Sequence, residues 1–108
     1  MSSRKGLGEF EQLLLLAVVR LGEGAYGVTM RREIEERTGR SVTLGAIYPT
    51  MDRLEKKGLV SSVMSEPTKE RGGRSRRYFQ IEPAGLEALT AARDVFQAMW
   101  DGVETRAT

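Results

Sequence analysis

Residues 43–64 have the sequence TLGAIYPTMDRLEKKGLVSSVM, in which a helical pattern passes directly into a strand pattern. The first part carries apolar side chains at every third or fourth position, at Leu44, Ile47, Met51 and Leu54. Such spacing is typical of the buried face of a helix. Thr43 is a suitable N-cap and Gly58 a suitable C-cap. We therefore predict a helix over residues 44–57 and a short strand over residues 59–64, which is rich in β-branched side chains.

Pro49 lies near the middle of this predicted helix. Proline removes one backbone hydrogen bond and crowds the preceding turn. We expect a bend or a shortened first half at this point, rather than loss of the helix.

A second strand is indicated by Tyr78, Phe79 and Ile81. The segment between the two strands, SEPTKERGGRS (residues 65–75), contains a proline and paired glycines. These residues are typical of a hairpin whose connection is longer than usual. Five of the nine residues from 69 to 77 are basic: Lys69, Arg71, Arg74, Arg76 and Arg77.

Two helices are predicted before residue 43. Residues 8–21 form the first, which is apolar nearly all round and must be covered on more than one face. A second subunit is a natural cover in so short a chain. Gly22 and Gly24 end this helix, and residues 26–37 form the next one. The inward-facing residues of that second helix are expected to be Val28, Met30 and Ile34.

A last helix begins at Pro83, where the missing N–H costs nothing, and extends to about Val103. Its apolar residues alternate spacings of three and four, as in a short heptad seam: Leu89, Ala92, Phe96, Met99 and Val103. The order of elements predicts a mainly α fold with a small β-hairpin. We expect a winged helix-turn-helix DNA-binding domain over residues 7–82, then a C-terminal dimerisation helix over residues 83–103. No large effector domain is expected after it.

Composition narrows the possible functions. The 108 residues include no cysteine and no histidine. Disulfides and thiolate metal sites are thus excluded, and a nucleophile-plus-base catalytic site is nearly unavailable. We expect no metal, no cofactor and no enzymatic activity. The longest apolar run, Leu13–Val19, is too short to span a bilayer, and no signal-peptide cleavage site follows it. We expect a cytoplasmic protein with no membrane partner.

Charge is distributed unevenly along the chain. Residues 66–77 carry five basic and two acidic groups, whereas the chain from Glu82 onward carries two basic and five acidic groups. This asymmetry predicts a polyanionic partner on one face, and double-stranded DNA is the expected partner. The third helix would enter the major groove while the basic hairpin lies along the neighbouring backbone. A winged helix that binds another protein is the alternative, and the basic hairpin argues against it.

Several stretches resemble the PadR family of bacterial transcriptional regulators. They are LLLLA (residues 13–17) with AYG (25–27), GAIYPTMDRLEKKGLV (45–60), the segment from Gly72-Gly73-Arg74 to Tyr78-Phe79, and Ala84-Gly85. The resemblance covers roughly residues 7–100, and the ordered set of motifs is specific. Met51 stands where leucine is commoner in the family, which is a substitution within the core.

The resemblance implies a homodimer that binds inverted-repeat operators, usually as a repressor. The chain resembles the short branch of the family, in which one C-terminal helix packs against the first helix and against its counterpart in the other subunit. Members of the family commonly lose DNA affinity when a small molecule binds. A small-molecule effector is therefore a candidate partner of this chain.

The expected DNA-binding residues are Thr43, Gly45, Tyr48, Thr50, Arg53, Lys69, Arg71, Arg74 and Arg76. In the family, the tyrosine at the position of Tyr48 contacts the DNA backbone; a half-buried packing role is the alternative. Thr43 either lies near a phosphate or only caps its helix. The alternative for Arg53 is a solvated helix end, and Arg76 or Arg77 could instead pair with a neighbouring side chain.

The expected dimer interface comprises Leu13, Leu14, Leu16, Leu89, Ala92, Phe96 and Met99. In the short branch, an aromatic side chain of the last helix can line a cavity at the dimer centre, where planar drugs stack. Phe96 and Trp100, the only tryptophan, are the candidates in this chain. A planar aromatic effector is thus the expected ligand, and simple interface packing is the alternative role of Trp100.

Overall fold

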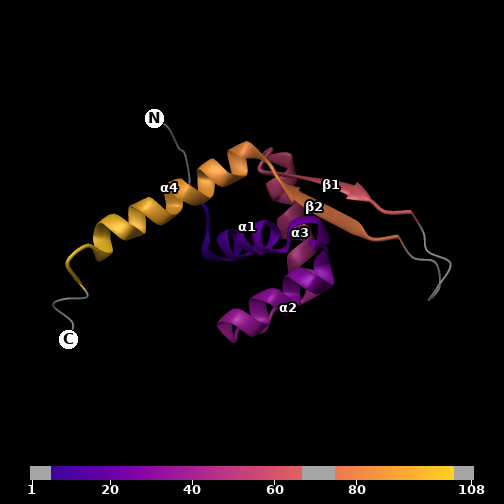
Figure 1. Ribbon diagram of the computed structural model, residues 1–108, viewed down its shortest axis with the longest axis horizontal. Coiled ribbons are helices and arrows are strands. Elements are labelled where there is room, and N and C mark those ends of the chain that lie inside the picture. Colours follow the sequence, from indigo (N-terminus) through magenta and orange to yellow (C-terminus); the bar gives the residue numbers. More distant parts are fainter. Residues whose placement is uncertain (1–5, 67–74, 104–108) are drawn as a thin grey trace.

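The computed structural model describes residues 6–66 and 75–103, and it contains the expected elements in the expected order (Figure 1). They are α1 (Glu9–Leu21), the short 3-10 helix η1 (Gly22–Gly24), α2 (Gly27–Thr38), α3 (Leu44–Lys56), β1 (Val60–Met64), β2 (Arg77–Ile81) and α4 (Pro83–Trp100). The fold is mainly helical with a two-stranded antiparallel hairpin, as predicted. Within the described residues, no helix is long and apolar enough to cross a membrane.

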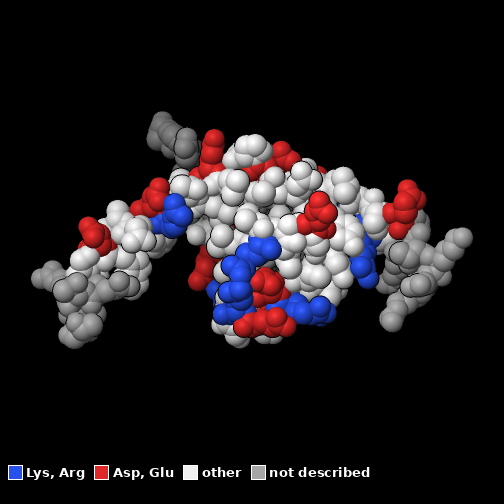
Figure 2. Space-filling model, viewed as in Figure 1, with Lys and Arg blue, Asp and Glu red and all other residues white. Residues whose placement is uncertain are grey.

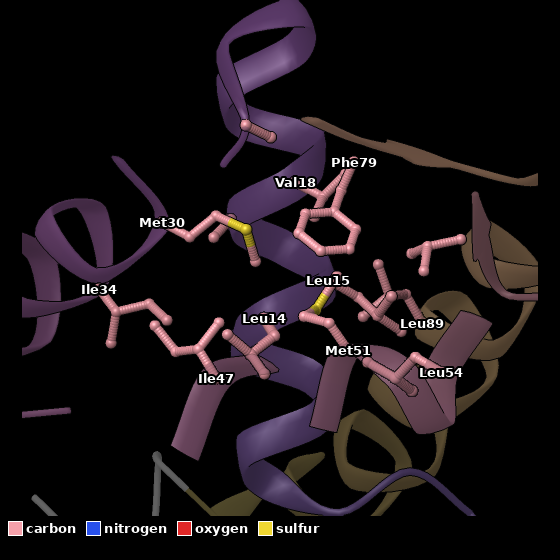
Figure 3. Packing of buried hydrophobic residues seen from close by; sticks show 13 residues of the cluster. Leu14, Leu15, Val18, Met30, Ile34, Ile47, Met51, Leu54, Phe79 and Leu89 are labelled. Atoms are coloured by element: carbon pink, nitrogen blue, oxygen red, sulfur yellow. The ribbon is translucent and has the colours of Figure 1, made fainter. Parts of the chain in front are cut away.

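Helix α1 forms the centre of the core. Leu14, Leu15 and Val18 are buried, and side chains from α2, α3, β2 and α4 converge on them (Figure 3). The surrounding residues include Met30, Ile34, Ile47, Met51, Leu54, Phe79 and Leu89. The buried side of α1 is therefore covered by its own chain rather than by a second subunit. Leu16 and Val19 remain exposed, at 45% and 41%.

Helix α3 begins where the sequence predicts. The Thr43 hydroxyl oxygen accepts a hydrogen bond from the backbone N–H of Ala46 at 3.1 Å, which confirms Thr43 as the N-cap. The helix is continuous through Pro49, which confirms that the proline does not abolish it. Of the two effects expected there, the shortened first half is wrong, and the bend stays a prediction. Proline leaves the carbonyl of Gly45 without its helical donor. Because Gly45 and Pro49 are both exposed, water can bind that carbonyl instead.

The root of the hairpin is fixed to the helices. In β1 and β2, Val60 lies opposite Ile81 and Ser62 lies opposite Phe79. Val60 and Phe79 are buried, and the N–H of Phe79 donates to the carbonyl of Ala25 at 2.8 Å. The hairpin then projects away from the helices, on the side opposite to the free end of α4 (Figure 1).

Helix α4 packs on the rest of the chain only through its first half. Gly85 and Leu89 are buried, whereas the large apolar side chains of the second half are 54–73% exposed: Val95, Phe96, Met99 and Trp100. The helix ends at Trp100 rather than near Val103, because Asp101 has the non-helical dihedrals φ −55° and ψ 121°. The second half of α4 extends as an arm (Figure 1). The radius of gyration, 16.1 Å, accordingly exceeds the ~13 Å expected of a compact chain of this length.

The docking of α4 depends on a close backbone approach at Gly85. A Cβ at this position would overlap the carbonyl oxygen of Leu59 and the side chain of Ile81. We expect Gly85→Ala to lower the free energy of unfolding by about 2 kcal/mol, since overpacking costs more than the ~1 kcal/mol that alanine gains in a helix. Denaturant unfolding at fixed protein concentration measures the effect. The control is Gly45→Ala, near the start of α3, where a Cβ meets nothing closer than 3.9 Å; it should be neutral or stabilising. Equal stability of the two variants would contradict the close approach.

Candidate nucleic-acid interface

The outer face of α3 is made of small and cationic side chains. Ile47, Met51 and Leu54 are buried against α1, which turns the opposite face of the helix to solvent. The exposed residues on that face or beside it are Thr43, Gly45, Ala46, Pro49, Asp52, Arg53 and Lys56. Small residues at the start of a helix let its backbone approach a partner closely. Thr43, Gly45 and Arg53 thus lie on one accessible face.

Ala46 and Pro49 belong to this face, although we did not single them out from the sequence. Each lies one helical turn from a residue that we did select, since Ala46 follows Thr43 by three positions and Pro49 follows Gly45 by four. Residues three and four apart are neighbours on a helix surface. The same periodicity that identified the buried face was therefore enough to find them.

Tyr48 is half-buried and packs against the core. Its ring lies 6.5 Å from that of Phe79, and it rests against Gly27 at the start of α2, where a Cβ would overlap the ring and the hydroxyl. Tyr48 therefore has the half-buried packing role that the sequence offered as the alternative. Contact of the Tyr48 hydroxyl with a phosphate stays a prediction.

The expectation for Thr50 needs a correction, because this side chain does not lie on the exposed face. Thr50 is 5% exposed. Its hydroxyl donates to the carbonyl of Ala46 at 3.0 Å and accepts a hydrogen bond from the guanidinium of Arg53 at 3.2 Å. Thr50 therefore orients Arg53, and its own hydroxyl is already used within the helix.

Arg76 and Arg77 are neighbours in sequence but face opposite sides of the hairpin, as successive strand residues do. The guanidinium of Arg76 lies 4.5 Å from the centre of the Tyr26 ring, and its Nη1 is 3.5 Å from the Tyr78 hydroxyl. The side chain of Arg77 turns to α3 and pairs with Asp52 and Glu55. Pairing with a neighbour, one alternative drawn from the sequence, is thus what Arg77 does.

The cations divide into paired and unpaired groups. Over α2 basic and acidic side chains alternate (Figure 2), and Arg20 and Arg37 both contact Glu33. The hydrogen bonds from these two arginines hold the pKa of Glu33 below its usual value. Four exposed cations have no ion pair with any other residue in the described ranges: Arg32, Arg53, Lys56 and Arg76. Their charge is available to a partner, and Arg53 and Lys56 lie on the outer part of α3.

The remaining cations of the predicted site, Lys69, Arg71 and Arg74, lie outside the described residues. Their contact with DNA stays a prediction.

A groove of about 470 Å³ runs between α1 and α4. Leu16 and Val19 line it from α1, while Leu89, Phe96 and Trp100 line it from α4. The structure thus brings together the two residues of the expected effector pocket, Phe96 and Trp100. Five of the residues expected in the dimer interface keep exposed surface in the single chain. Leu13 and Ala92 are half-buried, and Leu16, Phe96 and Met99 are exposed.

Leu14 and Leu89 are buried in their own chain, at 0% and 8% exposure. They therefore cannot offer much surface to a second subunit. Leu14 and Leu89 are therefore not interface residues. The sequence misled here because apolar side chains at helical spacing occur both in the core of a chain and in a dimer interface.

The chain resembles known transcriptional regulators in sequence and in structure. The sequence model of the transcriptional regulator PadR-like family matches residues 15–91. Transcriptional regulator Rv3488 of Mycobacterium tuberculosis is 35% identical over 74 residues, which are 68% of this chain and 64% of the relative. The matched part of the chain thus spans less than two thirds of that relative's length.

Solved structures of transcriptional regulators are similar to this chain as well. A PadR family transcriptional regulator from Eggerthella lenta is 27% identical, with a TM-score of 0.67 over 92% of this chain and 86% of that one. A PadR family transcription regulator from Clostridium difficile has a TM-score of 0.71 over 94% of this chain and 100% of that one; at 20% identity it supports the fold alone. These relatives are regulators rather than enzymes. The chain belongs to the PadR-like family of transcriptional regulators.

Proposed function

We propose that this protein is a sequence-specific DNA-binding repressor, which acts in the cytoplasm as a homodimer on an inverted-repeat operator. The observation that carries this proposal is the outer face of α3. Small side chains at its start leave room for the groove of a duplex, and unpaired cations follow at its end. Everywhere else, most cations within the described ranges are matched by carboxylates.

In this proposal residues 7–82 form the winged-helix DNA-binding domain. The outer face of α3 enters the major groove through Thr43, Gly45 and Arg53. Arg76 reaches phosphates from the outer end of the described part of the hairpin, and Lys69, Arg71 and Arg74 extend that contact along the backbone.

The same proposal gives α4, with the rest of residues 83–103, the role of a dimerisation element. An arm with an exposed apolar face is costly in water unless another surface covers it. A second copy would offer the same face, as the self-complementary contact of a two-fold dimer requires. Leu16, Phe96 and Met99 are the exposed residues that such a contact would bury.

Selection of duplexes from a random-sequence pool by the purified protein tests the proposal. The expected result is enrichment of an inverted repeat, with half-sites whose centres lie about one helical turn of DNA apart. Failure of the protein to enrich any duplex would contradict it, and a partner protein would then be the better assignment for the winged helix.

We further propose that a planar aromatic effector binds the groove between α1 and α4 and releases the protein from DNA. The groove is apolar on the side of Phe96 and Trp100, and Trp100 is 54% exposed within a single chain. Its rim carries Gln97, and stacking on an indole favours flat ligands. Binding there could change the angle of α4 and hence the spacing of the two α3 helices, which must match the DNA repeat.

Titration with planar aromatic dyes, cationic or neutral, is expected to quench the fluorescence of Trp100, because the dye would stack on the indole. Calorimetry with the Trp100→Ala variant, which lacks the fluorophore, should show binding about fivefold weaker, since stacking contributes ~1 kcal/mol. Dyes that leave the fluorescence unchanged, or that bind the alanine variant equally well, would mean that Trp100 is a packing residue.

A further inference from the structure

Arg77 is the centre of a network that joins the hairpin to α3. Its Nη1 donates to Asp52 Oδ1 at 2.7 Å, and its Nη2 donates to Glu55 Oε1 at 2.6 Å. Its Nε donates to the hydroxyl of Ser62 at 3.1 Å, and that hydroxyl donates to Glu55 Oε1 at 2.9 Å. The guanidinium also lies 4.8 Å from the centre of the Phe79 ring. Both strands and the helix thus share one set of contacts.

The network lies farther out along the hairpin than the apolar contacts. Val60 and Phe79 are the hairpin residues in the core, whereas the next outward residues of β1, Val63 and Met64, are 66% and 62% exposed. Arg77 pairs with Met64 in the strand register, at the outer end of both strands. Its bonds to Asp52 and Glu55 join this end of the strands to α3.

The two carboxylates of the network are unfavourable for the proposed function by themselves. Asp52 and Glu55 lie on the same helix as Arg53 and Lys56, the unpaired cations of the face that we propose to approach DNA. A carboxylate near a polyanion repels it. Their presence is explained if they serve a purpose that outweighs this repulsion.

We infer that Asp52 and Glu55 hold Arg77 as a positioning tether, which sets the angle between the hairpin and α3 and so fixes how the two can contact one duplex together. This inference rests on the proposed function. The hydrogen bonds from Arg77 and Ser62 also hold the pKa of Glu55 below its usual value, so the carboxylate stays ionised at neutral pH. Arg77 acts through other residues, and its side chain is only 27% exposed.

The double variant Asp52→Asn with Glu55→Gln separates this tether from simple electrostatics by the sign of its effect. Removal of two negative charges beside DNA should strengthen binding if only charge matters. If the tether matters, the variant binds its selected duplex about tenfold more weakly, because contacts made by α3 and by the hairpin no longer fit together. The control is Glu23→Gln with Glu36→Gln, which removes the same charge from exposed positions on η1 and α2 and should not weaken binding.

The probe is a duplex selected by the wild-type protein, and affinity is measured for it and for a scrambled duplex. The tether predicts that Arg77→Met also weakens specific binding, and that the triple variant is no worse than Arg77→Met, because the three residues act as one unit. Unchanged or stronger specific binding by the Asp52/Glu55 variant, with a normal unfolding curve, would overturn the inference.

Amide hydrogen exchange provides a readout that needs no DNA. The N–H of Ser65 donates to the carbonyl of Arg76 at 2.7 Å, at the outer end of the hairpin. In Arg77→Met this amide should exchange about tenfold faster, while amides of α1 are unchanged. If the wild-type protein selects no duplex, the proposed function fails, and the exchange rate alone decides whether the tether exists. An unchanged rate at Ser65 would overturn it.

Discussion

Phe96→Asp is expected to convert the dimer into a folded monomer. In one chain Phe96 is 61% exposed on the arm of α4, so its replacement removes little from the core. In the proposed dimer it is covered by the second copy, and an unpaired carboxylate in such an interface costs at least about 2 kcal/mol. Two-fold symmetry places two of them there. The dissociation constant should therefore rise about a thousandfold, as measured by sedimentation over a range of concentrations.

The matched control for this experiment is Ala98→Asp. It adds the same charge to an exposed residue of α4 about 200° around the helix axis from Phe96, on the side that carries Asp94 and Asp101. This variant should remain dimeric, and circular dichroism should show that both variants keep their helices. A Phe96→Asp protein that sediments as a dimer with unchanged affinity would place the interface elsewhere on the chain.

Periodicity alone was enough to predict most of the fold. The spacing of Ile47, Met51 and Leu54 gave the buried face of α3, and the two strands followed from β-branched and aromatic residues between turn signals. These features depend on local spacing, which a sequence displays directly. The same spacing also indicated which side of α3 is exposed, although Ala46 and Pro49 were overlooked.

The errors arose where one residue type serves two purposes. A threonine on a helix can face a partner or bond to the preceding turn, and Thr50 does the latter. Leu14 has the apolar character of an interface residue but lies in the core of its own chain. No local signal separates these outcomes, because they depend on which elements pack together.

The arginines of β2 illustrate what a sequence leaves open. The row of cations from residue 69 to 77 predicted a basic hairpin, but the partners of Arg77 lie 22 and 25 positions earlier, on α3. Strand alternation separates Arg76 from Arg77, and only the register of the hairpin against α3 determines which of them meets the carboxylates. This tertiary pairing changes the count of cations available to DNA.

Neutralising the three unpaired cations of the proposed interface is expected to have the second large effect. In Arg53→Gln with Lys56→Gln and Arg76→Gln, each lost phosphate contact should reduce the slope of log affinity against log salt by about 0.9. If all three contact phosphates, the slope falls by about 2.7 and affinity near 0.1 M salt falls roughly 10²- to 10³-fold. Both specific and random duplexes should be affected.

The most direct test of the DNA-binding account compares this variant with one that removes the same charge elsewhere. Arg20→Gln with Arg37→Gln and Arg40→Gln neutralises three cations that already pair with Glu33 or Glu9. Fluorescence anisotropy measures the affinity for a duplex at salt concentrations from about 50 to about 300 mM, a range over which counterion release lowers the affinity by orders of magnitude. The account predicts a large loss of slope for the Arg53, Lys56 and Arg76 variant and a wild-type slope for the control. Equal slopes for both variants would contradict it, because net charge alone would then govern the attraction.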